Sequence, residues 1–195
     1  MKPSLNVHRF SRFSTAATIE CNGTTQTGQW FFKFDDILGH AEFGAMFDSF
    51  KITKCVVNLQ LISNPDAFLY TNGAVNNQNL SNWYPKFWYI RDYDGGSADS
   101  LAQIKERQGV KFFVMRPNKT YKIAISPMVA VQTYRTATST GYAPKRLFLD
   151  MANGVDVPHY GVNYVVDALG QDPDNSQPFK IRYEIKFYFT CKDVR

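Results

Sequence analysis

Basic and aromatic side chains alternate along residues 179–191, and this pattern could contact a polyanion. Lys180, Arg182 and Lys186 fall on one face of the alternation, and the opposite face is apolar. Phosphate binding needs a density of positive charge rather than a motif, so such a face suits nucleic acid. The alternative is an ordinary solvated strand face, and for any single lysine that interpretation is the simpler one.

Four further basic residues complete the candidate set. Arg9 and Arg12 lie near the start of the chain, and Lys51 and Lys54 lie within a long alternating segment. The candidate nucleic-acid-binding residues are Arg9, Arg12, Lys51, Lys54, Lys180, Arg182 and Lys186. The net charge of +5 permits a polyanionic partner without requiring one, because the same excess also aids solubility.

Residues suited to catalysis or metal binding do not gather in this sequence. A catalytic metal site needs paired histidines beside a carboxylate, whereas the three histidines stand on separate segments: His8, His40 and His159. Three carboxylates lie close together, beside a Gly-Gly turn signal: Asp92, Asp94 and Asp99. This cluster indicates turn chemistry rather than a general acid and base. We therefore expect no enzyme activity, no metal site and no cofactor.

Length and composition indicate one β-rich domain. The chain has 195 residues, of which 44% are apolar and 20% charged, enough for one sizeable core. The 16 Phe and 11 Tyr favour strands. Cys21, Cys55 and Cys191 form no paired motif, which indicates reduced, buried thiols. We find no apolar run of membrane-spanning length and no signal peptide, so no membrane insertion is expected.

Residues 47–62 must position part of the candidate set. Cys55 and the residues after it alternate between apolar and polar, as in a strand with one buried face. Phe50 and Ile52 follow the opposite phase. A bulge at Thr53-Lys54 would bring both apolar sets onto one side.

The remaining segments predict about eight principal strands, without repeats or linkers. Residues 3–21 predict a first strand or a broken pair of strands. Further strands are predicted over residues 29–35, 47–62, 86–93, 110–114, 121–125, 147–151, 160–166 and 179–191. The segments 63–82 and 127–144 indicate loops, and 97–109 predicts a short helix capped by Ser97 and closed by Gly109. Strands without intervening helices form antiparallel sheets, and this number in one core predicts a two-sheet sandwich.

Several motifs occur in an order that is typical of one viral family. They are the aromatic–x–x–aromatic–basic–Ile entry at Phe47, Trp30-Phe-Phe-Lys-Phe-Asp-Asp-Ile-Leu, Lys145-Arg-Leu-Phe-Leu-Asp-Met followed by His159-Tyr-Gly-Val, and the stretch from Phe179 to Asp193. Together they resemble the capsid protein of circovirus-like viruses over nearly the whole chain.

The resemblance implies an all-β fold, a single eight-stranded antiparallel jelly-roll sandwich with one short helix in a loop. It places the first, central and last strands in one sheet, which groups the candidate basic residues. It also implies a structural role, self-assembly into a sixty-copy (T=1) icosahedral shell that encloses a single-stranded DNA genome.

The expected partners are further copies of the chain, single-stranded DNA bound through its phosphates, and an unknown host receptor. The protein would reside in the virion, with assembly in either the host nucleus or the cytoplasm. Capsid proteins of this family usually begin with an arginine-rich arm, but only Lys2, His8, Arg9 and Arg12 precede residue 15. We therefore expect residues 1–195 to be one capsid domain without that arm.

Two other functions remain open at this point. A satellite-RNA virus coat protein would share the fold. A carbohydrate-binding sandwich would use Trp83, Tyr84 and Trp88 as a stacking platform and would form a monomer or small oligomer rather than a shell.

Overall fold

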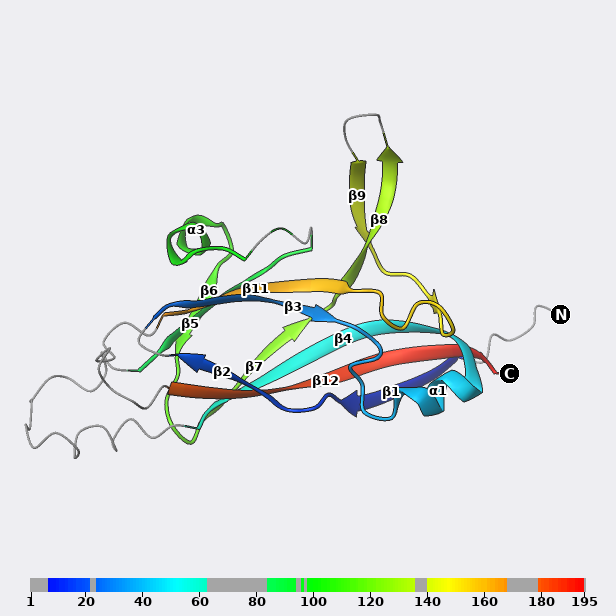
Figure 1. Cartoon of the computed structure of the whole chain (residues 1–195), viewed down its shortest axis with the longest axis horizontal. Helices are drawn as coiled ribbons and strands as arrows, with labels where there is room; N and C mark the ends of the chain where they lie inside the picture. Colours follow the sequence, from blue (N-terminus) through cyan, green and yellow to red (C-terminus); the bar gives the residue numbers. More distant parts are fainter. Residues whose placement is uncertain are drawn as a thin grey trace, which may run out of the picture.

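The computed structural model describes residues 7–21, 24–62, 84–93, 96, 98–135, 140–167 and 179–194. Figure 1 shows their strands and helices in chain order. The strands are β1 (Val7–Phe13), β2 (Ala17–Cys21), β3 (Gln26–Phe32), β4 (Phe47–Leu61), β5 (Lys86–Arg91), β6 (Lys111–Val114), β7 (Thr120–Ile125), β8 (Met128–Arg135), β9 (Thr140–Lys145), β10 (Leu149–Asp150), β11 (His159–Asp167) and β12 (Phe179–Val194). The helices are α1 (His40–Met46) and α3 (Leu101–Glu106).

Two six-stranded antiparallel sheets form the sandwich. The first sheet contains β1, β2, β4, β7, β10 and β12, and the second contains β3, β5, β6, β8, β9 and β11. Short strands share positions: β1 and β2 pair with the two halves of β12, and β10 and β7 pair with separate parts of β4. In the second sheet, β5 and β8 likewise share one side of β11, opposite β3.

Each sheet is thus four strand positions wide, which gives the eight positions of a jelly roll and confirms the predicted fold class. The strand number rises from eight to twelve because four of these positions are each shared by two short strands: β1 and β2, β10 and β7, β5 and β8, and β6 and β9. The first of them, β1 followed by β2, is the broken pair that residues 3–21 suggest.

Strand β4 contains the predicted bulge. Lys54 pairs with Tyr188, and Ile52 pairs with the next residue, Phe189, so Thr53 is the extra residue on its strand. The Thr53 hydroxyl donates a hydrogen bond to the Tyr188 carbonyl oxygen at 2.9 Å. The bulge brings the apolar residues before and after it onto the same buried side.

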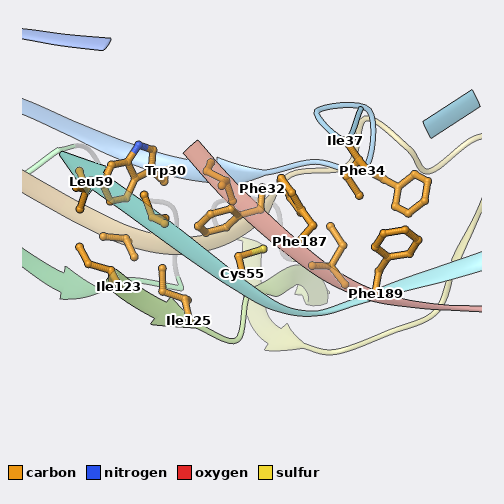
Figure 2. Packing of buried hydrophobic residues seen from close by; sticks show 14 of the residues in the cluster. Trp30, Phe32, Phe34, Ile37, Cys55, Leu59, Ile123, Ile125, Phe187 and Phe189 are labelled. Atoms are coloured by element: carbon orange, nitrogen blue, oxygen red, sulfur yellow. The ribbon is translucent and has the colours of Figure 1, made fainter. Parts of the chain in front are cut away.

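Aromatic side chains from both sheets fill the core, as Figure 2 shows. Phe34 packs against Phe50 and Phe189, with ring centroids 4.2 Å and 5.1 Å away. Phe32 of β3 meets Phe187 of β12 edge to face at 6.2 Å. Each fully buried Phe contributes about 1.5–3 kcal/mol relative to an exposed one. This packing holds β12 by its inner face and leaves its other face to solvent.

The two faces of β12 are separated as the sequence predicts. Its inner residues are buried: Ile181, Ile185, Phe187, Phe189 and Cys191. Tyr183, on the same face, is half-buried, and the side chain of Phe179 lies outside the described part of the chain.

The helix expected over residues 97–109 is shorter and has a different cap. α3 begins after Ser100, whose hydroxyl accepts the backbone N–H of Gln103 at 3.3 Å. The Gln103 side chain in turn accepts the Ser100 N–H at 2.8 Å, which completes a capping box. A second helix, α1, forms in the segment that precedes β4.

Residues 127–144, expected to form an irregular loop, contain most of a β-hairpin instead. β8 pairs with β9 along its length, and Met128 and Val129 join the hairpin to β11. Figure 1 shows both strands standing away from the sandwich. The expectation is wrong because a projecting hairpin has little buried face and so lacks a clear apolar alternation.

Some predicted features lie outside the described residues: the loop at 63–82, Trp83, Asp94 and Ser97. Within the described part, no helix has the length and apolar character needed to cross a membrane.

Candidate nucleic-acid interface

Strand pairing gathers six of the seven candidate basic residues on the solvent side of the first sheet. Directly opposed residues in an antiparallel pair point to the same side, and β12 supplies the reference. Lys180, Arg182 and Lys186 alternate with its buried residues. Thr190 pairs with both Arg9 and Lys51, and Tyr188 pairs with Lys54. We call this surface the basic face, defined by Arg9, Lys51, Lys54, Lys180, Arg182 and Lys186.

The bulge in β4 is what unites Lys51 and Lys54. Residues three apart in a regular strand point to opposite sides of the sheet. Because Thr53 is an extra residue, both lysines instead fall on the solvent side. The same irregularity that completes the core therefore also concentrates charge.

Arg12 does not join this group, which corrects its placement with Arg9. It pairs with Phe187, a buried residue on the inner side of β12. Its guanidinium carbon lies 5.6 Å from the ring centroid of Phe43, at the open edge beside β1. Arg9 and Arg12 are three positions apart in an unbulged strand, so they cannot share a face.

The basic face also contains residues that the sequence-based set omits. Lys192 pairs with Ser49, and Lys122 pairs with Asn58, which places both on this side. Aromatic rings lie among the lysines: Phe13, Tyr188 and Phe148. The alternation along β12 already indicates Lys192 and Tyr188, whereas the alternation over residues 147–151 does not show which strand Phe148 lies beside.

Lysine side chains lie over these rings. The Lys186 Nζ is 5.3 Å from the ring centroids of both Phe13 and Tyr188. The Lys192 Nζ lies 4.8 Å from the centroid of Phe148, and the Lys51 Nζ lies 5.6 Å from it. Such contacts contribute roughly 0.5–1 kcal/mol when exposed, and they hold flexible lysines near the sheet.

Carboxylates reduce the charge of this surface without cancelling it. The Lys180 Nζ lies 3.0 Å from Glu20 Oε1, and their side chains are 45% and 51% exposed. Pairing also places Glu184 and Asp150 on this side. Solvent screens exposed ion pairs of this kind, so a phosphate can compete for Lys180 at small cost.

The histidine and cysteine residues are possible metal ligands and nucleophiles. Within the described residues, no group of three or more His, Cys, Asp or Glu side chains could hold a metal ion. Burial raises the pKa of Cys21 and Cys191 to about 12 and also raises that of Cys55. Thiols with such pKa values remain protonated and are poor nucleophiles.

Two carboxylates of the expected turn cluster are buried rather than solvent-exposed. Arg107 places Nη2 2.8 Å from Asp99 Oδ1 and Nη1 3.5 Å from Asp92 Oδ2. The Asp99 backbone N–H donates to Asn163 Oδ1 at 3.2 Å. This network fastens the α3 segment to β11 and is a structural feature that sequence proximity alone does not reveal.

The proposed carbohydrate platform is not open at Trp88. The Phe112 ring stacks on it with centroids 4.5 Å apart, and the Lys105 Nζ lies 5.1 Å from its centroid. Tyr84 is half-buried against the core.

Comparison with known proteins identifies the family. A family model for the circovirus capsid protein matches residues 2–195. The chain belongs to this family. It is therefore a viral capsid protein with a place in the virion, and the predicted resemblance is confirmed.

Solved capsid structures have the same fold as this circovirus capsid protein. The 60-mer BFDV capsid protein superposes with a TM-score of 0.66 at 13% identity, covering 97% of this chain and 95% of that one. Tobacco necrosis virus gives a TM-score of 0.54 at 8% identity, covering 98% and 97%. A Macrobrachium rosenbergii nodavirus structure gives 0.51 at 11% identity, covering 98% and 58%. A search of curated protein sequences found no match.

Proposed function

We propose that this capsid protein assembles into a sixty-copy icosahedral shell around single-stranded DNA, with the basic face turned toward the genome. The observation that carries the proposal is the gathering of six basic side chains on one side of one sheet, where the bulge in β4 brings Lys51 and Lys54 together. The 60-mer state of the BFDV capsid protein supports the assembly number. In this function residues 1–195 act as one structural domain with no enzymatic role.

The binding mode we propose is phosphate contact without base-specific readout. Positive charge spread along strands follows a backbone and does not present a recognition element to base edges. For single-stranded nucleic acid, the logarithm of the affinity should fall by about 0.7 per logarithmic unit of salt for each phosphate neutralised. Many subunits binding together would hold the genome even if each makes few contacts.

Charge reversal of Lys180, Arg182 and Lys186 to Glu tests this genome contact. We expect shells of normal size with less nucleic acid, measured as a lower 260/280 absorbance ratio. A matched variant reverses three exposed cations off the basic face, Lys105, Lys111 and Arg116, and should package as the parent does. Equal packaging by the first variant would show that the genome contact lies elsewhere.

We further propose that the β8–β9 hairpin contacts a neighbouring subunit. It projects from the sandwich (Figure 1). Tyr142, on β9, is 64% exposed. A large aromatic side chain on a projecting element suits burial in an interface. Tyr142→Arg should leave a folded protein that fails to form shells by light scattering and negative-stain microscopy, whereas Tyr142→Phe should assemble. Assembly of the arginine variant at the parent's concentration would place the contact elsewhere.

A further inference from the structure

The basic face carries three aromatic rings, which lie in a row along the sheet: Phe13, Tyr188 and Phe148. Phe13 lies opposite Lys186, and Tyr188 is the next residue on the same side of β12. Phe148 lies further along, beneath Lys51 and Lys192. Phe13 and Phe148 are 39% and 38% exposed. Single exposed rings are common on proteins, but here each ring also has an ammonium group above it.

A hollow of about 360 Å³ opens beside Phe13 on the same side of the sheet. Its lining residues include an aromatic residue, a cation, two amides, a hydroxyl and a carboxylate: Phe13, Arg182, Asn58, Gln60, Thr120 and Glu184. Ligand pockets typically begin at about 300 Å³. A flat ring, hydrogen-bonding amides and a cation are the groups that suit the base, the base edge and the phosphate of one nucleotide.

We propose that the basic face binds unpaired nucleobases as well as phosphates, by stacking them on Phe13, Tyr188 and Phe148. This inference rests on the proposed function and specifies its ligand as single-stranded nucleic acid. An arriving base takes the ring surface that a lysine ammonium covers. The flexible lysine stem then carries the ammonium to the adjoining phosphate, so the cation keeps a partner throughout.

Stacking explains why such a surface selects single strands. Bases in a duplex are already stacked on one another, and side chains reach them only at their edges in the grooves. A single strand exposes the flat surfaces, and every base has one, so stacking is tolerant of sequence. The hollow beside Phe13 is then the position where one base is held most completely.

An abasic oligomer separates stacking from charge. Freshly purified, unassembled protein is titrated into fluorescein-labelled oligothymidylate, and separately into an abasic oligomer of equal length and charge, at several salt concentrations. We expect the oligothymidylate to bind on the order of tenfold more tightly, since stacking supplies affinity that phosphates alone do not. A duplex of the same length should show no such gain.

Two ring variants, Phe13→Leu and Phe148→Leu, are measured singly. Each should weaken oligothymidylate binding several-fold, leave abasic binding unchanged and keep the salt slope. The matched control Phe112→Leu removes a ring that is 56% exposed on the second sheet and should change neither affinity. Charge reversal of Lys180, Arg182 and Lys186 should instead weaken the binding of both oligomers and reduce the salt dependence of that binding.

The outcomes distinguish this inference from the proposed function. Equal affinity of the parent protein for the two oligomers, with binding still lost on charge reversal, overturns stacking and leaves the phosphate contact intact. Unchanged preference for oligothymidylate in both leucine variants also overturns the assignment to these rings. If neither the oligothymidylate nor the abasic oligomer binds at low salt, the genome contact itself is contradicted.

Discussion

Ser14 exchanges two hydrogen bonds with Ile185 at the gap between β1 and β2. The Ser14 N–H donates to the Ile185 carbonyl oxygen at 2.8 Å, and the Ile185 N–H donates to the Ser14 hydroxyl oxygen at 3.1 Å. The hydroxyl takes the place of the carbonyl that a continuous strand would supply. The buried Ile185 N–H therefore keeps a hydrogen-bond acceptor although the strand opposite it is interrupted.

Ser14→Ala should destabilise the fold by about 1–3 kcal/mol, because it leaves the Ile185 N–H without its partner in a buried setting. Urea unfolding measures the change. Thr18→Ala, at an exposed position on β2, serves as the control and should stay within about 0.5 kcal/mol of the parent. Equal effects of the two substitutions would contradict the role of the hydroxyl.

Ile185→Asp should cost several kcal/mol, since it places an unpaired carboxylate where the side chain is 7% exposed. The expected result is insoluble protein or a large drop in melting temperature. Arg182→Asp introduces the same residue on the exposed side of β12 and should be nearly neutral for stability. A soluble Ile185→Asp protein with the parent's melting temperature would rule out a buried face at this position.

Stability should fall as the pH drops below about 6.5 because of His159. Burial lowers its pKa from the ordinary value of 6.5, while its Nδ1–H donates to the Val157 carbonyl oxygen at 3.0 Å. The unfolded chain therefore takes up a proton before the folded protein does, and protonation favours unfolding. Melting temperatures at about pH 7.5 and 5.5 measure this effect. His159→Asn retains an N–H donor without titrating, and an equal pH dependence in that variant would refute the assignment.

Arg107→Ala should loosen the α3 segment, because Asp92 and Asp99 lose their cation while remaining buried. The Arg107 side chain is 39% exposed, so solvent screens part of the interaction and we expect a loss of about 1–2 kcal/mol. Hydrogen exchange should increase over residues 98–110. Glu106→Ala, which alters an exposed residue of the same helix, should leave exchange unchanged.

The sequence could predict the parts of the fold that contact the core. Burial imposes a period of two on β4 and β12, and a change of phase between Ile52 and Cys55 is enough to predict the bulge. The β8–β9 hairpin could not be found in this way. Its strands extend beyond the core, so burial imposes no apolar pattern on their outer parts.

The candidate site was only partly predictable for a related reason. Six basic residues could be assigned once their strands were known, and the spacing between Arg9 and Arg12 already excludes a shared face in a regular strand. Phe148 could not be assigned because its place depends on the pairing of β10 with β4, a contact between distant segments. The buried partners of Arg107 depend in the same way on β11, which follows much later in the chain.

The position of β12 in the chain also determines when a newly made subunit can complete its fold. β12 separates β1 from β4 and is synthesised after all the other strands described above. While it is still within the ribosome, the facing edges of β1 and β4 have no partner, and the aromatic core lacks Phe187 and Phe189. The first sheet must therefore close after translation has passed this segment. Translation itself thus delays completion of the subunit fold until residues 179–194 have left the ribosome.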